Sequence, residues 1–296
     1  LRRRERKKGG EACSGLRGPC FVNKRGRHSS RKNLKDRVVM SEEDKAFATL
    51  ILAAGKGTRM KSDLVKVLHP VAGRPMLDYV LNLAERMGSS RIAVIVGHQA
   101  ELVEARYGSR GLAFVYQREQ LGTGHAVLQA AEAFKDYRGT ILILCGDVPL
   151  LRASTIRELM DRHRASGAAL TVLTTLLEDP FGYGRIVKDA GGNVLGIVEH
   201  RDATEEQRKI REINTGIYCA ENPFLFEAVS EIGNDNAQRE YYFTDIFAIA
   251  RRKGVRTATV IAPDPGEVMG INSPDDLARA TQIVQERLTE KLKDSR

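Results

Sequence analysis

The residues best suited to chemistry lie in the glycine-rich segment 52–66, LAAGKGTRMKSDLVK, which follows the first apolar run. Its small residues and two glycines let backbone amides approach a ligand closely, while Lys56, Arg59 and Lys66 supply three cationic side chains. Amides and cations in one loop favour a polyphosphate ligand. A merely flexible loop is the weaker interpretation, because the segment follows a predicted strand at the edge where open α/β sheets bind ligands.

Two common phosphate-binding loops do not fit this segment. A dinucleotide-binding fingerprint needs Gly or Ala at the position of Met60. A Walker loop needs Gly-Lys-Ser/Thr where the chain reads Gly55-Lys56-Gly57. The loop therefore belongs to another class of phosphate site.

Two further segments can complete a nucleotide site. Asp147 follows the apolar run TILIL and Cys145-Gly146. A Gly-Asp pair alone is only a turn, but a carboxylate at the end of a central strand beside a phosphate loop can hold Mg²⁺ on phosphate oxygens. In QREQLGTGH, the Gln117 amide and the backbone of a Gly-Thr turn can read the edge of a base. His125 falls inside a predicted helix start, which favours a structural role for it.

The elements that must position these residues alternate between short apolar runs and longer amphipathic stretches, which is typical of βα units around a mainly parallel sheet. Strands are predicted over 47–53, 91–96, 113–116, 140–145 and 169–175, and helices over 75–88, 99–107, 123–134 and 154–165. After Asp179 the rhythm changes. The patterns there predict a hairpin of 184–188 and 194–199, strands over 215–220 and 256–261, helices over 223–231 and 243–253, and a final helix from Ser273-Pro274.

The net charge of +9 suggests a nucleic-acid binder, but it is concentrated at one end. Residues 1–40 hold 14 Lys and Arg against three acidic residues, a balance of +11, so the other 256 residues carry 33 basic and 35 acidic side chains, or −2. The composition of this basic segment predicts disorder. Basic runs without aromatics give only salt-sensitive, sequence-independent attraction. We therefore expect no specific nucleic-acid partner, with nucleic-acid binding through residues 1–40 kept as the alternative.

The rest of the composition indicates a cytoplasmic protein without a membrane partner. No apolar run has the length of a secretory or transmembrane segment, and the four cysteines suit a reducing compartment. Cys13, Cys20 and His28 lack a fourth ligand and a paired CxxC spacing, so no zinc site is expected. The sequence begins with Leu, and Met40 precedes SEED, a helix-start signature formed with Ser41 and Asp44. Either residues 1–39 are an upstream extension or they form a translated leader.

A set of motifs identifies the family that this sequence resembles. LAAGKGTRM with Lys66, QLGTGHA, GDVPL, GYGRI, GIVEH, INTGIY, EYYFTDI and GIN resemble, in order and spacing, the uridylyltransferase half of the bacterial bifunctional enzymes that make UDP-N-acetylglucosamine. The GTRM loop is typical of sugar-phosphate nucleotidylyltransferases in general, whereas QLGTGHA, GYGRI, IVEH and INTG together indicate the N-acetylglucosamine-1-phosphate member. The resemblance implies an α/β, Rossmann-like nucleotidyltransferase fold with a mainly parallel mixed sheet and helices on both faces. It places this domain in residues 41–280, between the basic segment and a C-terminal helix over 281–296.

The resemblance also assigns roles position by position. The nucleotide would lie against Leu52, Ala53, Ala54 and Gly55, with uracil on Gln117, Gly122 and Thr123. Gly184, Glu199 and Asn214 would hold the N-acetylhexosamine, with Tyr242 and Thr244 nearby. Cys145 and Gly146 complete the substrate-binding set together with Lys66, Asp147 and Asn272. The expected catalytic residues are Arg59, Lys66 and Asp147, and the expected Mg²⁺ ligands are Asp147 and Asn272.

The implied reaction is Mg²⁺-dependent transfer of a uridylyl group from UTP to N-acetylglucosamine-1-phosphate by in-line displacement. The attacking phosphate oxygen is already anionic at neutral pH, so no general base is needed. Another sugar phosphate, such as glucose-1-phosphate, or another nucleotide is the alternative within the same class.

The sequence departs from the family at four points. Val65 stands where proline is usual, Cys145 where a polar or aromatic residue is usual, and Ser273 follows the metal asparagine. The family's second half, a left-handed β-helix that transfers acetyl groups and forms trimers, has no counterpart, and residues 281–296 resemble the start of the linking helix. Acetyl transfer is therefore not predicted, and the oligomeric state is left open.

Overall fold

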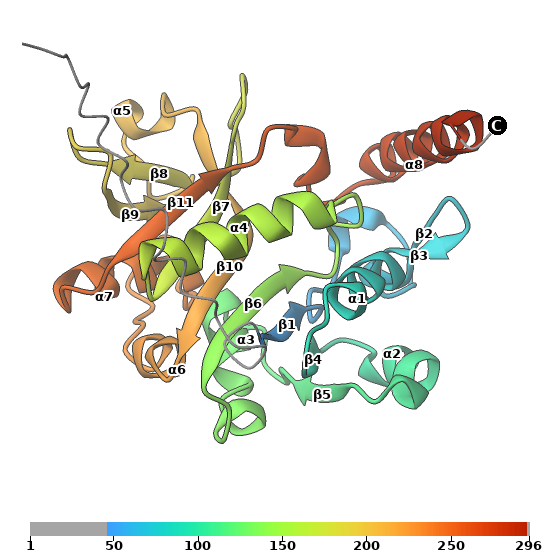
Figure 1. Cartoon of the computed structure of the whole chain (residues 1–296), viewed down its shortest axis with the longest axis horizontal. Helices are drawn as coiled ribbons and strands as arrows, with labels where there is room; N and C mark the ends of the chain where they lie inside the picture. The colour runs from blue at the N-terminus through green and yellow to red at the C-terminus, as the bar shows by residue number, and fades with distance from the viewer. Residues whose placement is uncertain (1–45, 295–296) are drawn as a thin grey trace, which may run out of the picture. The chain divides into compact units, whose positions relative to one another are not determined.

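The computed structural model describes residues 46–294, drawn in colour in Figure 1. These residues fall in the unit Ser41–Arg296. The predictions for the basic segment 1–40, for the helix start at Ser41 and Asp44, and for Cys13, Cys20 and His28 lie outside the described residues.

The described residues form a nine-stranded mixed sheet in the order β11-β7-β10-β6-β1-β4-β5, which β8 and β9 extend beside β10. Its strands are β1 (Ala48–Leu52), β4 (Ile92–Val96), β5 (Ala113–Tyr116), β6 (Gly139–Cys145), β7 (Leu170–Leu176), β8 (Arg185–Lys188), β9 (Val194–Val198), β10 (Glu212–Asn222) and β11 (Thr257–Ile261). A separate two-stranded ladder joins β2 (Pro70–Val71) and β3 (Arg74–Pro75).

The pairing of the central strands brings several loops to one edge. Strands β6, β1, β4 and β5 are parallel neighbours, and Leu52 at the end of β1 is in register with Ile95 and Cys145. Strand β10 runs antiparallel to β6 and β7, and its register shifts between Asn214 and Ile217. The predicted mainly parallel, mixed sheet is confirmed, and its carboxyl edge collects the loops that follow β1, β4, β5 and β6.

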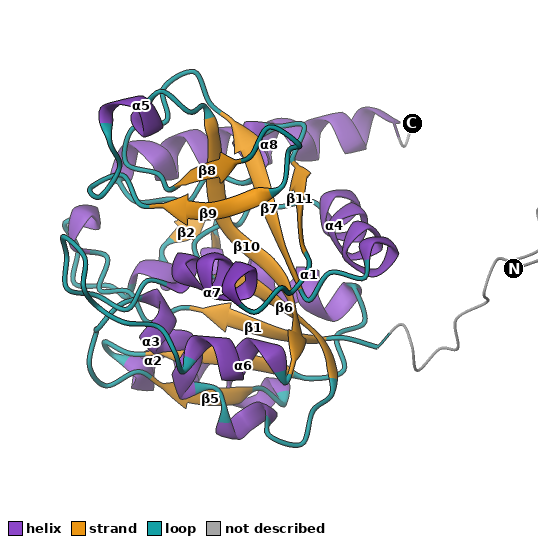
Figure 2. Cartoon of the chain, turned by 90° about the vertical axis from the view of Figure 1, so that its left-hand side faces the viewer, coloured by secondary structure: helices purple, strands orange, loops and turns teal. Residues whose placement is uncertain are grey.

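Helices cover both faces of the sheet, as predicted (Figures 1 and 2). Successive strand residues point to opposite faces, so Ile51 packs in one apolar cluster and Leu50 in the other. The first face carries α1 (Met76–Arg86), α2 (Ala100–Tyr107) and α4 (Ala153–Ser166). The second carries α3 (Thr123–Gln129), α6 (Phe224–Val229) and α7 (Ile246–Arg252).

Some predicted boundaries need correction. The helix predicted over 123–134 ends at Gln129, and a 3₁₀ turn, Glu132–Phe134, follows. The helix predicted over 243–253 begins as the 3₁₀ turn Phe243–Asp245. Apolar spacing does not separate these tighter turns from an α-helix, because both put apolar residues on one side. The short helix α5 (Glu205–Arg208) was not predicted; Thr204 and Gln207 cap it reciprocally.

The final helix, α8 (Pro274–Asp294), begins directly after Ser273. Its buried Ala280 and Val284 pack with Met60, Val71 and Met76, which places the first half of α8 beside the glycine-rich loop and β2. Among the described residues, no helix has the length and apolar character that crossing a membrane requires.

Candidate functional site

A pocket of about 350 Å³ lies at the carboxyl edge of the sheet. It gathers predicted residues from three separate loops, those that follow β1, β5 and β6. Those that line it are Leu52, Ala53, Ala54, Gly55, Lys66, Gln117, Gly122, Thr123, Cys145 and Asp147. Most of the predicted nucleotide site therefore forms one cavity.

The glycine-rich loop is shaped by contacts that exclude larger side chains. Gly57 has φ of +63°, and a Cβ there would lie 2.6 Å from Lys66 Cβ, so glycine lets the loop fold back against Lys66. A Cβ on Gly55 would meet nothing within 4 Å, so its backbone borders open space in the pocket. The amide of Gly146 donates to Leu52 O at 2.9 Å, which joins the loop after β6 to the end of β1.

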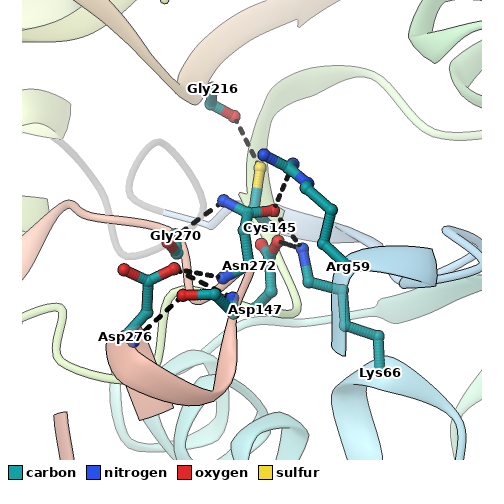
Figure 3. Close-up of polar contacts among 9 residues, drawn as sticks. Arg59, Lys66, Cys145, Asp147, Gly216, Gly270, Asn272 and Asp276 are labelled. Carbon is teal, nitrogen blue, oxygen red and sulfur yellow. Dashed lines mark hydrogen bonds and ion pairs between the residues drawn. The ribbon is translucent and has the colours of Figure 1, made fainter. Parts of the chain in front are cut away.

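Four predicted residues meet in a polar cluster beside this loop (Figure 3). Lys66 Nζ donates to Asp147 Oδ2 and, at 2.7 Å, to Asn272 Oδ1. Arg59 donates to the same Asn272 oxygen at 2.8 Å. The side chains of Lys66 and Asp147 are only 12% and 23% exposed. The cluster thus combines two cations with two acceptor oxygens, and it brings together four residues that the family resemblance assigns to phosphate and metal.

The two acceptor oxygens in this cluster, from Asp147 and Asn272, are suited to bind a divalent cation. A carboxylate oxygen and an amide oxygen converge on one ammonium group, so both already face a common cationic position. Mg²⁺ prefers oxygen ligands, keeps several waters, and is commonly held by one or two protein groups together with substrate phosphates. Within residues 46–294, no three His, Cys, Asp or Glu side chains gather as a metal site. Asp147 and Asn272 are the two residues of this cluster whose oxygens could hold such an ion.

A buried glutamine forms one wall of the pocket. Gln117 Nε2 donates to Gly122 O at 3.0 Å and lies 3.2 Å from His125 Nδ1. Because a carbonyl oxygen can only accept, this contact identifies the amide nitrogen and leaves Oε1 to face other partners. The His125 ring lies in α3 between Gln117 and Gln129, which agrees with the structural role predicted for it.

A downstream segment clamps the Gly-Thr turn. Gly122 has φ of +113°, and a Cβ there would lie 2.6 Å from Tyr241 O. Gly124 donates to that oxygen at 2.7 Å, and Thr123 Oγ1 accepts from the Phe243 amide at 3.0 Å. The turn is therefore fixed by residues more than 100 positions away, and Tyr242, predicted near the sugar, is buried within the same segment.

The three predicted sugar-binding residues form a second group, outside the residues that line the pocket. Asn214 donates its amide to Gly184 O at 2.9 Å, and a Cβ on Gly184 would lie 3.4 Å from Glu199 Oε1. Thr244 Oγ1 donates to Glu199 Oε1 at 2.9 Å. Burial raises the pKa of the Glu199 carboxyl above its ordinary value of 4.5, and the hydrogen bond from Thr244 partly offsets this.

The β10 register shift connects the two groups. Gly216 donates its amide to Asn214 Oδ1 at 3.0 Å, and Cys145 Sγ donates to Gly216 O at 3.3 Å. Burial and the nearby Asp147 carboxylate raise the pKa of the Cys145 thiol to about 12, against a smaller lowering by Lys66. Cys145 is therefore a neutral contact between the pocket and β10 and not a nucleophile.

The sequence patterns missed several contributors to this site. Gln120 and Glu240 line the pocket, and Tyr241 supplies the carbonyl that shapes the turn. Gly97 was also missed: a Cβ there would lie 2.6 Å from Gln120 Nε2 and 2.8 Å from Ala54 O. Its position directly after β4 is the one local signal that marks it, because the carboxyl ends of parallel strands share an edge.

Two solved structures share this fold. A UDP-glucose pyrophosphorylase complexed with UDP-glucose superposes with a TM-score of 0.65, at 18% identity, over 82% of this chain and 99% of that chain. A glucose-1-phosphate thymidylyltransferase from Bacillus anthracis gives a TM-score of 0.62, at 19% identity, over 80% of this chain and 95% of that chain. These likenesses confirm the α/β nucleotidyltransferase fold.

Sequence relatives agree with the resemblance found from the motifs. The bifunctional protein GlmU of Geobacter metallireducens is 55% identical over 247 residues, which are 83% of this chain and 52% of the relative. The bifunctional protein GlmU of Pelobacter propionicus is 52% identical over 246 residues, 83% of this chain and 54% of the relative. The chain thus spans about half the length of these relatives. The model of the MobA-like NTP transferase domain matches residues 49–211, more than half of the sequence, and the chain belongs to that family.

Proposed function

We propose that this chain transfers a uridylyl group from UTP to N-acetylglucosamine-1-phosphate, releasing pyrophosphate, with Mg²⁺ as the metal ion. The proposal rests on three features that lie together at one edge of the sheet. These are a glycine-rich loop with Lys66 and Arg59, the oxygen pair of Asp147 and Asn272, and Gln117, whose amide oxygen can pair with a base. The similarity to proteins named bifunctional protein GlmU supports the choice of N-acetylglucosamine-1-phosphate.

The geometry around Gln117 favours uracil over cytosine. Its amide nitrogen is engaged by Gly122 O and the His125 ring, so its remaining function is that of an acceptor. Uracil presents an N3–H donor between two carbonyl oxygens, whereas cytosine has an acceptor at N3. An acceptor at Gln117 Oε1 therefore pairs with uracil, and a cytosine in the same pose would leave a buried polar group unpaired.

The reacting groups require alignment and charge compensation. Lys66 and Arg59 donate into the cluster, where they would bind the α- and β-phosphates of UTP and offset charge on the departing pyrophosphate. The sugar-phosphate oxygen attacks the α-phosphorus in line, and the bond to pyrophosphate breaks on the opposite side. Holding two reactants in such a geometry can supply ~7–11 kcal/mol of barrier reduction in well-oriented systems.

Asp147 and Asn272 are the residues that would hold Mg²⁺. When bound, the ion supplies positive charge at the phosphate oxygens as the bonds change. Lys66 donates to both oxygens and so keeps them oriented toward one position. Its ammonium can move to a phosphate when the nucleotide binds.

The second group of residues, Gly184, Glu199 and Asn214, would bind the sugar. Glu199 accepts from Thr244 with one oxygen, and its partly buried carboxyl can also accept from sugar hydroxyls or from an acetamido N–H. Gly184 leaves space beside Glu199 that a Cβ would narrow. We propose that this group distinguishes N-acetylglucosamine-1-phosphate from glucose-1-phosphate.

A substrate panel tests the proposal. Pyrophosphate release is measured for UTP, CTP, TTP and ATP against N-acetylglucosamine-1-phosphate and glucose-1-phosphate, with Mg²⁺ or EDTA. We expect the highest kcat/KM for UTP with N-acetylglucosamine-1-phosphate and no turnover in EDTA. Preference for glucose-1-phosphate would support the alternative substrate, and turnover in EDTA would contradict the metal requirement.

Free thiols and the proposed small-molecule reaction guide our proposal for the cellular compartment and for binding partners. We place the reaction in the cytoplasm, which agrees with the free thiols of Cys145 and Cys219. We propose no specific nucleic-acid partner. RNA binding that persists without residues 1–39, or that depends on base sequence, would contradict this.

A further inference from the structure

We infer that Asp276 is a positioning residue that fixes Asn272 for metal and phosphate binding through the first turn of α8. The inference rests on the proposed function, because it gives Asn272 a task at the reacting phosphates. Asp276 itself touches neither Lys66 nor Asp147 among the described contacts, and it acts through the backbone of Asn272 (Figure 3).

The carboxylate of Asp276 does more than cap a helix. Ser273 Oγ accepts from the Asp276 amide at 3.2 Å, and Asp276 Oδ2 accepts from the Ser273 amide at 2.9 Å, which is a reciprocal capping box. The same Oδ2 also accepts from the Asn272 amide at 2.9 Å. This additional bond lies outside the helix and has no part in capping it.

The remaining contacts of Asn272 explain why its backbone must be held. Asn272 Nδ2 donates to Gly270 O at 3.2 Å, which turns Oδ1 toward Lys66 and Arg59. The Ile271 amide donates to Asp147 O at 3.0 Å, so the loop is tied to the segment that carries the other metal ligand. The hydrogen bond from the Asn272 amide to Asp276 is the third such contact, and it fixes the backbone of Asn272 relative to α8.

A charged acceptor suits this position. A carboxylate forms stronger bonds to amides than a neutral acceptor does, and it also lies at the positive end of α8. Residues that orient a metal ligand typically change metal affinity by about 10- to 100-fold when they are removed. Loss of the Asp276 oxygen would therefore weaken metal binding with little change in binding of the sugar phosphate.

The chain offers two matched controls. Asp275 is the neighbouring exposed acid in the same helical turn, and its side chain makes no hydrogen bond or ion pair among the described residues. D275A therefore removes the same charge without touching Asn272. S273A removes the hydroxyl that accepts from Asp276 but leaves the bond from the Asn272 amide to Asp276, so it tests helix capping alone.

The experiment measures Mn²⁺ binding in the presence of UTP by electron paramagnetic resonance, the Mg²⁺ dependence of turnover, and the melting temperature. We expect D276A to raise the Kd for Mn²⁺ and the Mg²⁺ concentration needed for half-maximal turnover, each about tenfold or more. The KM for the sugar phosphate should be unchanged. D276N keeps an acceptor oxygen and should restore much of the affinity. D275A should match the wild type, and S273A should lower the melting temperature without changing metal affinity.

The outcomes separate this inference from the proposed function. Equal Mn²⁺ affinity in D276A and D275A would overturn the role of Asp276. So would equal loss of affinity in D276A and S273A, because helix capping would then explain it. A wild-type chain that binds Mn²⁺ with UTP but forms no UDP-sugar contradicts the proposed function, while the Mn²⁺ constants still decide the role of Asp276. A wild-type chain that binds no Mn²⁺ with UTP overturns both.

Discussion

Lys66 and Asp147 form an ion pair at the carboxyl edge of the sheet, and the same ammonium donates to Asn272 Oδ1 at 2.7 Å. The cation expected to bind phosphate is thus held by the two oxygens expected to bind metal. Phosphate would draw Lys66 away from these oxygens and free them for a cation. Nucleotide and metal should therefore bind cooperatively.

This arrangement predicts a synergy in ligand stabilisation. A ligand that binds only the folded state raises stability by RT ln(1 + [L]/Kd). Mg²⁺ alone must displace Lys66 from both oxygens, so it should shift the melting temperature little. UTP and Mg²⁺ together should give a larger shift than the sum of their separate shifts. Additive shifts in a thermal melt would contradict the coupling.

Asp147→Asn should remove activity without unfolding the chain. The substitution keeps the size of the side chain but removes the charge that holds the metal and pairs with Lys66. Because a metal ion supplies several kcal/mol of charge stabilisation, we expect turnover to fall on the order of 100-fold or more. Asp63→Asn changes an exposed acid of the neighbouring glycine-rich loop and serves as the control in the pyrophosphate assay. Near-normal turnover in Asp147→Asn would exclude the metal role.

Gly122→Ala should damage the base-binding turn. At φ of +113°, the new Cβ would lie 2.6 Å from Tyr241 O, so the turn must move away from its clamp. We expect a loss of about 1–3 kcal/mol in the free energy of unfolding and a higher KM for UTP, because Gln117 bonds to Gly122 O.

Gly111→Ala is the matched control for this change. Gly111 also has a positive φ, +69°, but a Cβ there would meet nothing within 4 Å. It should cost some stability and leave the KM for UTP unchanged. Equal effects of both substitutions on KM would mean that the contact with Tyr241 does not shape the base site.

Sequence patterns predict which site residues lie together when those residues follow neighbouring strands of the sheet. The apolar runs that precede the segments of Lys66 and Asp147 predict both at one edge of the sheet, and the parallel pairing of β1 with β6 brings them together. Asn272 lies 206 residues from Lys66, and only the family resemblance connected the two. Long-range contacts of this kind leave no periodic signal along the chain.

The same physical reason explains the elements that were misjudged. Strand β10 begins at Glu212, before the predicted start at residue 215, because pairing of Glu212 with Leu176 and of Ile213 with Arg185 extends it through polar residues. Its register shift after Asn214 brings Gly216 to Cys145. These features are decided by strand partners and not by local propensity.

Glu199→Gln tests the partly buried Glu199 carboxyl through the pH dependence of stability. Burial is the main cause that raises the pKa of Glu199, and the folded-state pKa therefore exceeds the unfolded one. The stability linked to such a group is fully present below the unfolded pKa and is lost as the pH rises through the folded pKa. At neutral pH the wild type carries this cost, whereas glutamine, which can still accept from Thr244, does not. The melting temperature of Glu199→Gln relative to the wild type should thus rise from pH 4.5 upward.

The same variant should separate the sugar group from the nucleotide pocket. Glu199 lies beside Gly184 and not among the residues that line the pocket, so Glu199→Gln should raise the KM for the sugar phosphate and leave the KM for UTP unchanged. Glu227→Gln, at an exposed position of α6, provides the control for loss of one carboxylate. If both variants show the same pH dependence of melting, burial does not raise the pKa of Glu199. If the KM for UTP rises with that for the sugar phosphate, the two groups of residues form a single binding unit, because one carboxylate then affects both substrates.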